Sequence, residues 1–498
     1  MFRVIAVLAV AFICLQIISA APVLAEDRFF VGPRAMGMAG ANVACVNDNS
    51  AQYYNPAAFG FFGRHKEDTE KLGADVDNNN LAARDWRVNV YGGAGYRLHK
   101  DLGDLLDDLS GIDINELSAD SIESASDIEN LIKATEILNR LDEPGNAITA
   151  DVHGGVGIGI GHGAVGLLAF SQANARVASV DITNLGISGA GDINTEINSV
   201  TIPGNDGLTS LFTASQQAAL LAAGLNASAI QQLDYAARKV GIDHGTLQQT
   251  VDILATVVSL TTGASSGGNL EDNTTSAMLE GFGHCEVPLS YGYAFNDNLA
   301  IGANIKYMLG RVYGSELLVF NNDSGDIIKE ADEYYKETTT FGIDLGAMYR
   351  IKRFNFGIVA RNINSPKFNG PTVNSRKFDD KKIDPAVTAG IAFIPYEGFT
   401  LEADYDLTKT ETVLPGYDTQ NLAVGLEWLM LRVMTLRLGA YNNMAESDIG
   451  WVYTAGLGLN ILGVRLDIGG AYSADEGEFD NQSFPIETRA VVQLSLDY

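Results

Sequence analysis

The sequence predicts an all-β transmembrane barrel of about fourteen antiparallel strands, and three observations support this fold class. Segments in which apolar and polar residues alternate recur from about residue 285 to the C-terminus. They run near the roughly 9–11 residues of a membrane-spanning strand, whereas strands average about five or six residues in soluble proteins. Tight turns and long polar loops alternate along the chain. No apolar run after the N-terminal leader reaches the roughly 18 residues that a membrane-spanning helix needs.

Composition removes several other classes of protein. The chain has 498 residues, of which 46% are hydrophobic, so it can bury a core and is not disordered. A net charge of −29 argues against nucleic acid as a partner, because phosphate binding needs clustered Lys and Arg. The three cysteines include no CxxC pair, and we expect no metal and no cofactor. Cys45 and Cys285 are expected to be free thiols, although a disulfide between them is left open.

The N-terminus has the pattern of a secretory signal peptide. Arg3 supplies a positive charge, twelve apolar residues follow from Val4 to Leu15, and small residues precede a cleavage site after Ala25. The apolar run is too short to span a bilayer as a helix. We therefore expect residues 1–25 to be removed on export, and the mature chain to reach the bacterial outer membrane.

The strands are located by their alternation. Leu289, Tyr291 and Tyr293 share one face of an extended chain, with Ser290 and Gly292 on the other. The same pattern predicts strands at 84–98, 149–161, 163–182, 281–295, 299–320, 337–351, 354–363, 385–395, 399–409, 420–429, 433–443, 449–461, 464–473 and 487–498. An even number of strands puts both ends of the barrel domain, residues 84–498, on the periplasmic side.

The connections follow the pattern of an outer-membrane barrel, which has short periplasmic turns and long external loops. Tight turns are predicted at 296–298, 352–353, 396–398, 430–432 and 462–463, and long loops at 314–336, 364–384, 410–419, 443–448 and 474–487. The last strand alternates and ends on Tyr498. It resembles the terminal strand of bacterial outer-membrane proteins, which implies the barrel-assembly machinery as a partner.

Two inserts, residues 99–148 and 184–280, carry helical instead of strand periodicity, and strand parity makes them external loops. Their apolar faces either form a capture surface for hydrophobic ligands or pack on each other. The first insert holds 13 acidic and 3 basic residues, and the second holds 9 and 2. Most of the negative charge is therefore external, where divalent cations would bridge it to lipopolysaccharide, a predicted partner beside outer-membrane lipid.

A motif near the N-terminus resembles a known family. Residues 30–44 read FVGPRAMGMAGANVA, and residues 47–58 read NDNSAQYYNPAA. This pattern is similar to the opening segment of the FadL-type outer-membrane transporters, and within that clan to the conjugal-transfer TraF-like barrel proteins. Ala39 departs from the pattern, which more often has Gly at this position.

The resemblance implies that residues 26–83 fold inside the barrel as a hatch that moves to admit a ligand. Small residues suit a backbone that lies close to the barrel wall, and Asn-Pro suits a rigid turn. The hatch residues carried over by the motif are Gly32, Arg34, Gly37, Met38, Gly40, Asn55, Pro56 and Ala57. The family also implies a lateral opening in an early strand, for which the polar residues Ser171, Gln172 and Asn174 are candidates, although an ordinary strand end is an equal alternative.

Charged residues on the predicted lumen side are the remaining candidates for chemistry: Glu402, Asp404, Glu427, Arg437, Arg465 and Asp467. Such rows are more often a mutually paired, solvated wall than a catalytic set. The chain contains no nucleophile elbow, HExxH pair or P-loop, so we predict no catalytic residue and no enzyme.

The predicted function is passive uptake of hydrophobic small molecules, such as long-chain fatty acids or aromatic hydrocarbons, through a lumen gated by the hatch. The alternative is an accessory outer-membrane protein of conjugal transfer without transport activity, which rests on the TraF-like resemblance. A surface adhesin or receptor is a third possibility, suggested only by the size of the external loops.

Overall fold

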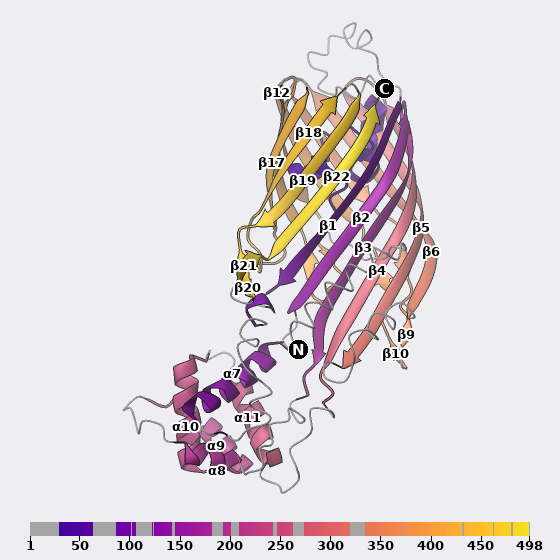
Figure 1. The fold of residues 1–498 in the computed structure, drawn as a ribbon. Helices are drawn as coiled ribbons and strands as arrows, with labels where there is room; N and C mark the ends of the chain where they lie inside the picture. Colours follow the sequence, from indigo (N-terminus) through magenta and orange to yellow (C-terminus); the bar gives the residue numbers. More distant parts are fainter. Residues whose placement is uncertain are drawn as a thin grey trace.

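Fourteen antiparallel strands close into a barrel in the computed structural model of the chain (Figure 1). The structure describes residues 29–62, 86–100, 102–105, 122, 124–141, 145–181, 193–200, 209–242, 247–261, 273–318, 334–373, 375–430, 433–461, 463–479 and 482–497. The predicted signal peptide, residues 26–28 and 63–83 of the predicted hatch, and Tyr498 lie outside these residues.

Strands that follow one another pair with each other, and β1 (Trp86–His99) pairs with β22 (Glu487–Asp497) to close the barrel. The twelve strands between them are β2 (Ala147–Ile160), β3 (Gly163–Ser179), β4 (Ser276–Ala294), β5 (Leu299–Leu318), β6 (Tyr335–Ile351), β7 (Phe354–Arg361), β12 (Ala386–Tyr396), β13 (Phe399–Asp406), β16 (Asn421–Met430), β17 (Met434–Asn443), β18 (Val452–Ile461) and β19 (Val464–Ser473). The predicted fold class and the count of fourteen strands are confirmed.

Some strand boundaries differ from the prediction. β4 begins at Ser276 and not at 281, because residues 276–280 continue the pairing with the end of β3 up to Ser179. β18 begins at Val452 and not at 449. Polar and small residues obscure the alternation at these ends. The start of each strand is set there by its backbone pairing with the neighbouring strand, which the sequence pattern does not show.

Large apolar side chains cover the outer wall of the barrel. Leu289, Ile305 and Leu438 each expose 60% or more of their surface, and similar residues face outward from nearly every strand. A soluble protein rarely exposes a continuous apolar surface of this extent. The outer wall therefore fits the hydrocarbon of a membrane, which a closed sheet can cross with its backbone fully paired.

None of the described helices is both long and apolar enough to cross a membrane.

The long connections lie at one end of the barrel and the tight turns at the other, as Figure 1 shows. Several long connections carry short hairpins. These are β8 (Lys367–Phe368) with β11 (Lys381–Lys382), β9 (Thr372–Val373) with β10 (Arg376–Lys377), β14 (Thr410–Glu411) with β15 (Asp418–Thr419), and β20 (Glu476–Phe479) with β21 (Gln482–Pro485). The sequence did not predict them, because strands of two to four residues are too short to show alternation.

The helices α7 to α11 form a bundle beyond the end that carries the long connections (Figure 1). α7 (Ala125–Leu141) lies between β1 and β2, whereas α8 (Ile193–Ser199), α9 (Ala214–Ala223), α10 (Ala227–Val240) and α11 (Leu247–Thr261) lie between β3 and β4. Helix starts are set by local caps. The Thr213 hydroxyl accepts a hydrogen bond from Gln216 N, and the Asn226 side chain accepts one from Ala229 N.

The apolar faces of these helices pack on one another. Ile128 and Leu131 of α7 join Leu233 of α10 and Leu254 of α11 in one core that is separate from the core of the barrel. Among the helix side chains whose burial the structure describes, Leu221 is the only large apolar one left exposed. Of the two alternatives for the inserts, packing on each other is the one that the structure shows.

The described part of the predicted hatch, residues 29–62, lies inside the barrel, and we call these residues the hatch. Almost all of them are buried. The hatch contains α2 (Pro33–Gly37), α3 (Ala51–Tyr54) and the 3₁₀ helix η1 (Pro56–Phe61). Its aromatic and small side chains form a common core with inward-facing residues of the wall. The hatch thus occupies the lumen where it contacts the wall.

A closed barrel of this kind should resist unfolding by sodium dodecyl sulfate at room temperature. We expect the purified chain to migrate faster on a denaturing gel before boiling than after it, because the intact barrel stays compact. Heating should convert the faster band into the slower one. Identical migration before and after boiling, with the chain in the soluble periplasmic fraction, would contradict the fold.

Candidate functional site

The hatch is shaped by its own small and rigid residues. Gly32 has a φ of +87°, a conformation that favours glycine, and it turns the chain into α2, whose first residue is Pro33. Asn55 caps the next turn, since its side chain accepts a hydrogen bond of 3.1 Å from Ala57 N. Pro56 follows as the first residue of η1. Asn55 and Pro56, which the sequence predicted as a turn, thus begin η1, whereas Gly32 was predicted only as a small residue close to the wall.

Wall glycines face the hatch backbone across a very short distance. A Cβ atom on Gly302 would overlap the Pro56 carbonyl, and one on Gly357 would overlap the Val43 carbonyl. On the opposite wall, a Cβ on Gly469 would lie 2.9 Å from the Pro33 carbonyl oxygen. Such glycines are Gly292, Gly302 and Gly357 on β4, β5 and β7, and Gly425, Gly439, Gly456 and Gly469 on β16–β19. The glycine content of these strands thus makes room for the hatch.

Two carboxylates of β13 hold consecutive amides of the hatch. Asp404 Oδ2 accepts hydrogen bonds from Asn42 N at 2.8 Å and from Val43 N at 3.0 Å. Glu402 Oε1 accepts one from Ala44 N at 2.6 Å. Residues two apart on a strand point to the same side, so both carboxylates face the lumen. Charge-assisted bonds of this kind are stronger than bonds between neutral groups.

Arg34 joins the hatch to a chain of buried charges. Its guanidinium lies 3.0 Å from Glu427 Oε1, and Arg437 donates to the other oxygen of Glu427 at 2.8 Å. Arg437 also pairs with Asp467 at 2.7 Å, and Arg465 pairs with the second oxygen of Asp467 at 2.7 Å. The structure therefore brings together four of the predicted lumen charges and one predicted hatch residue.

Cys45 lies beside this chain of charges. Arg34 donates a hydrogen bond to its sulfur at 3.0 Å, and the thiol donates to Glu402. Burial raises the pKa of the Cys45 thiol well above its ordinary value and outweighs the Arg34 guanidinium, which lowers it. Cys45 and Cys285 are both free, so no disulfide fastens the hatch to the wall.

Every predicted hatch residue of the motif is buried in the lumen. Gly37 lies against Gly456, and Met38 packs in a small cluster with Ala44, Cys45 and Ala392. Gly40 has a φ of +86°. The sequence could not reveal which wall residues these positions meet, because their partners lie several hundred residues away.

Two further groups of lumen charges were not predicted. Glu487 lies 2.9 Å from Arg97 and 2.7 Å from Arg489, which in turn lies 2.6 Å from Asp151. On the other side, Lys306 lies 3.3 Å from Glu286 and 3.1 Å from Asp344. Glu286, Lys306 and Asp344 alternate with outward apolar residues on their strands, and that spacing is the signal that would have found this second group.

The candidate lateral opening is not interrupted in the structure. Ser171, Gln172 and Asn174 pair without a gap with both β2 and β4, and Gln172 and Asn174 are buried on the lumen side. A gap in the β3–β4 pairing lies instead at Gly166–Leu167, opposite Val287–Pro288. Proline has no N–H to donate, so this part of the ladder is weaker.

A hatch residue fills that gap from inside the barrel. The Gln52 side chain donates to the Pro288 carbonyl at 3.3 Å and to the Ser290 hydroxyl at 3.1 Å. A Cβ on Gly166 would lie 2.7 Å from Gln52 Oε1. Gln52 of the hatch therefore bonds to β4 at the position where the pairing between β3 and β4 is interrupted.

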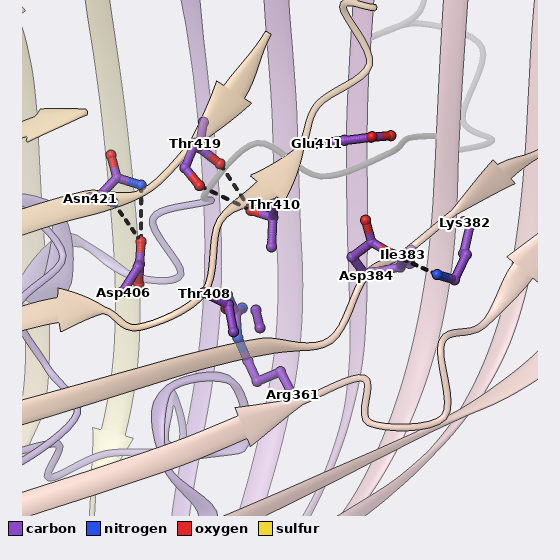
Figure 2. Close-up of a pocket in the computed structure, with 11 residues that line it drawn as sticks. Arg361, Lys382, Ile383, Asp384, Asp406, Thr408, Thr410, Glu411, Thr419 and Asn421 are labelled. Carbon is purple, nitrogen blue, oxygen red and sulfur yellow. Dashed lines mark hydrogen bonds and ion pairs between the residues drawn. The ribbon is translucent and has the colours of Figure 1, made fainter. Parts of the chain in front are cut away.

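A small polar pocket of about 30 Å³ lies at the loop end of β7, β12, β13 and β16 (Figure 2). Its charged side chains are largely engaged with neighbours. Lys382 lies 2.8 Å from Asp384, and Asn421 donates from both its backbone and its side chain to Asp406. Such a volume holds little more than water. Among the described residues, no group of three or more His, Cys, Asp or Glu side chains is placed to hold a metal ion.

A family model described as "F plasmid transfer operon, TraF, protein" matches residues 52–406, which is more than half of the chain. The chain belongs to this TraF family. The predicted TraF-like link is therefore confirmed. The match includes Gln52, Asn55, Glu402 and Asp404, so it spans about the last third of the hatch and the β13 carboxylates that bond to Asn42, Val43 and Ala44.

Solved structures similar to this TraF-family barrel include two toluene transporters and a FadL homologue. The toluene transporter TbuX of Ralstonia pickettii has 11% identity and a TM-score of 0.46, with 94% of this chain and 98% of that one covered. The toluene transporter TodX of P. putida has 9% identity and a TM-score of 0.45, with 95% and 99% covered. A FadL homologue of Pseudomonas aeruginosa has 11% identity and a TM-score of 0.42, with 96% and 99% covered. No curated protein matches the chain in sequence.

Proposed function

We propose that this chain is an outer-membrane barrel that admits hydrophobic small molecules, such as long-chain fatty acids or aromatic hydrocarbons, through a lumen closed by the hatch. The observation that carries the proposal is the apolar, aromatic cluster that the hatch and the wall form in the lumen, next to the paired lumen charges. Porin-type barrels that pass polar solutes have a polar, water-filled interior. An apolar lining favours apolar solutes, because their transfer from water into an apolar environment lowers the free energy.

This interior is built from both sides. Phe170 of β3 lies 4.9 Å from Phe29 and 5.8 Å from Tyr53 of the hatch, measured between ring centroids. Phe282 and Met308 of the wall are fully buried in the same core. If the hatch moved, these wall residues would line an apolar passage.

The contacts of the hatch with the wall are compatible with movement. They are hydrogen bonds, ion pairs and close packing against glycine, and no disulfide adds to them. Displacement of the hatch would therefore break no covalent bond. Outer-membrane lipid, lipopolysaccharide and the barrel-assembly machinery are the partners that we propose for a barrel in this location.

Uptake by cells tests the proposal. A deletion strain should take up labelled long-chain fatty acids or toluene more slowly than the parent, and the wild-type gene should restore the rate. Uptake of a hydrophilic sugar serves as the control and should be the same in all strains. Unchanged uptake of every hydrophobic compound tested would refute transport by this barrel.

A role in conjugal transfer is the second candidate, and the description of the matching family model favours it. In this role the barrel would be an accessory outer-membrane protein without transport activity. Deletion in a donor strain should then lower mating frequency while uptake of hydrophobic compounds stays the same. An unaltered mating frequency would remove this candidate.

A further inference from the structure

The connection between β7 and β12 folds back into the barrel and places an aromatic ring in the lumen. Phe368 of β8 is fully buried. Its ring centroid lies 4.7 Å from that of Phe282 and 6.3 Å from that of His284, both on the inner face of β4. His284 in turn lies 5.2 Å from Phe170. A loop residue thus occupies a cage of aromatic wall residues.

The wall is shaped to receive this ring. A methyl group on Gly310 of β5 would overlap the Phe368 ring, so the glycine leaves a slot for it. Gly314, four residues further along β5, leaves a similar slot for Phe378 of the same loop. The loop also bonds to the wall at its edge, where Asn369 N donates to the Thr338 hydroxyl at 3.1 Å.

The charges next to the cage are paired with one another. Lys306 lies between Glu286 and Asp344 and donates to Asn362 at 2.7 Å. A ligand that replaced the Phe368 ring would therefore meet aromatic faces and no uncompensated charge. A neutral aromatic ring of phenyl size fits this environment, because tilted and edge-on ring contacts favour it.

We propose that Phe170, Phe282, His284 and the Gly310 slot form a binding site for a neutral aromatic ring, and that Phe368 is a tethered occupant of it. A ligand must displace Phe368 to bind, and the ligand then lies next to the hatch, because Phe170 also contacts Phe29. The loop therefore closes the outer side of the lumen until a ligand takes the place of its ring. This inference rests on the proposed uptake of hydrophobic molecules and names the site of first capture.

The test uses the purified full-length chain in lipid nanodiscs, with fluorobenzene as the probe followed by ¹⁹F NMR. The Phe368→Ala variant should bind fluorobenzene at least about tenfold more tightly than wild type, because the tethered ring no longer competes. Adding Gly310→Ala to this variant should abolish the gain. Phe29→Ala is the matched control, since it removes another fully buried ring that contacts Phe170 from the hatch side.

A second measurement on the wild-type chain separates a true site from a cavity made by mutation. Saturating fluorobenzene should speed hydrogen exchange at Phe378 N and Ile383 N, which the folded loop protects by bonds of 2.9 Å to the Pro371 and Pro366 carbonyls. Exchange in β12 should not change. The proposal is overturned if exchange in the loop is unaffected, or if Phe29→Ala binds the probe as tightly as Phe368→Ala. Both measurements use isolated protein and report only on binding of the ring. Binding can therefore fail while cells still take up hydrophobic compounds, and uptake can fail while binding persists.

Discussion

A valine in place of Gly302 should force the hatch away from the wall and make the barrel leak. The Cβ of residue 302 would overlap the Pro56 carbonyl and Ala57 N, which are backbone atoms and cannot rotate away. Overpacking a tight site costs about 1–3 kcal/mol, and about 1.4 kcal/mol shifts an equilibrium tenfold. We expect release of a small dye from liposomes that contain the variant to be at least about tenfold faster than with wild type.

The matched control for this prediction is Gly470→Val on the outer face of β19. The nearest atom to a Cβ there is the Arg489 carbonyl oxygen at 3.4 Å, an ordinary contact, and the hatch is on the other side of the wall. This variant should leak no more than wild type. If both variants leak faster than wild type to the same extent, the added volume disturbs the barrel itself. If neither variant leaks faster than wild type, the hatch does not seal the lumen.

The barrel could be predicted from the sequence because its signals are local. Alternation along one strand and the polar residues of a tight turn each lie within about a dozen residues, so fourteen strands could be placed one at a time. Boundaries were less accurate where polar residues interrupt the pattern, as at Ser276. The short hairpins of the long connections gave no such signal.

The contacts of the candidate site could not be predicted, because they join distant positions. Arg34 bonds to Glu427, which lies 393 positions further along the chain. Gly302 is required because the Pro56 backbone lies directly against it. The motif did place Arg34 and Asn55 in the lumen, and alternation placed Glu427 and Arg437 on the inner face. Only the structure shows that Arg34 binds Glu427 and that Asn55 bonds to the Ala347 carbonyl of the wall.

The helical inserts illustrate the same limit. Periodicity predicts an apolar face on α7 and on α11, but it does not show what covers that face. Ile128 and Leu254 belong to different inserts and still share one core. A core assembled from two loops is visible only when the β-barrel brings those loops together.

Replacement of Arg34 by Leu should loosen the hatch more than any single substitution on the outer wall. The change would leave Glu427 facing Arg437 alone and would remove the bonds to Asn42 and Cys45. Breaking a buried ion pair by removing one partner costs about 3–5 kcal/mol, which corresponds to at least about a hundredfold change in the population of the open state. Cys45 is the natural reporter, because it is buried beside Arg34.

We expect a membrane-impermeant maleimide to label Cys45 at least about a hundredfold faster in the Arg34→Leu variant, in a Cys285→Ser background. The chemistry of the thiol sharpens this test. Arg34 lowers the pKa of Cys45, so its loss alone would leave less thiolate and slow the reaction. Faster labelling can then come only from better access. Arg238→Leu, which removes a 3.0 Å ion pair with Asp234 in the helical bundle, is the control and should leave the rate unchanged.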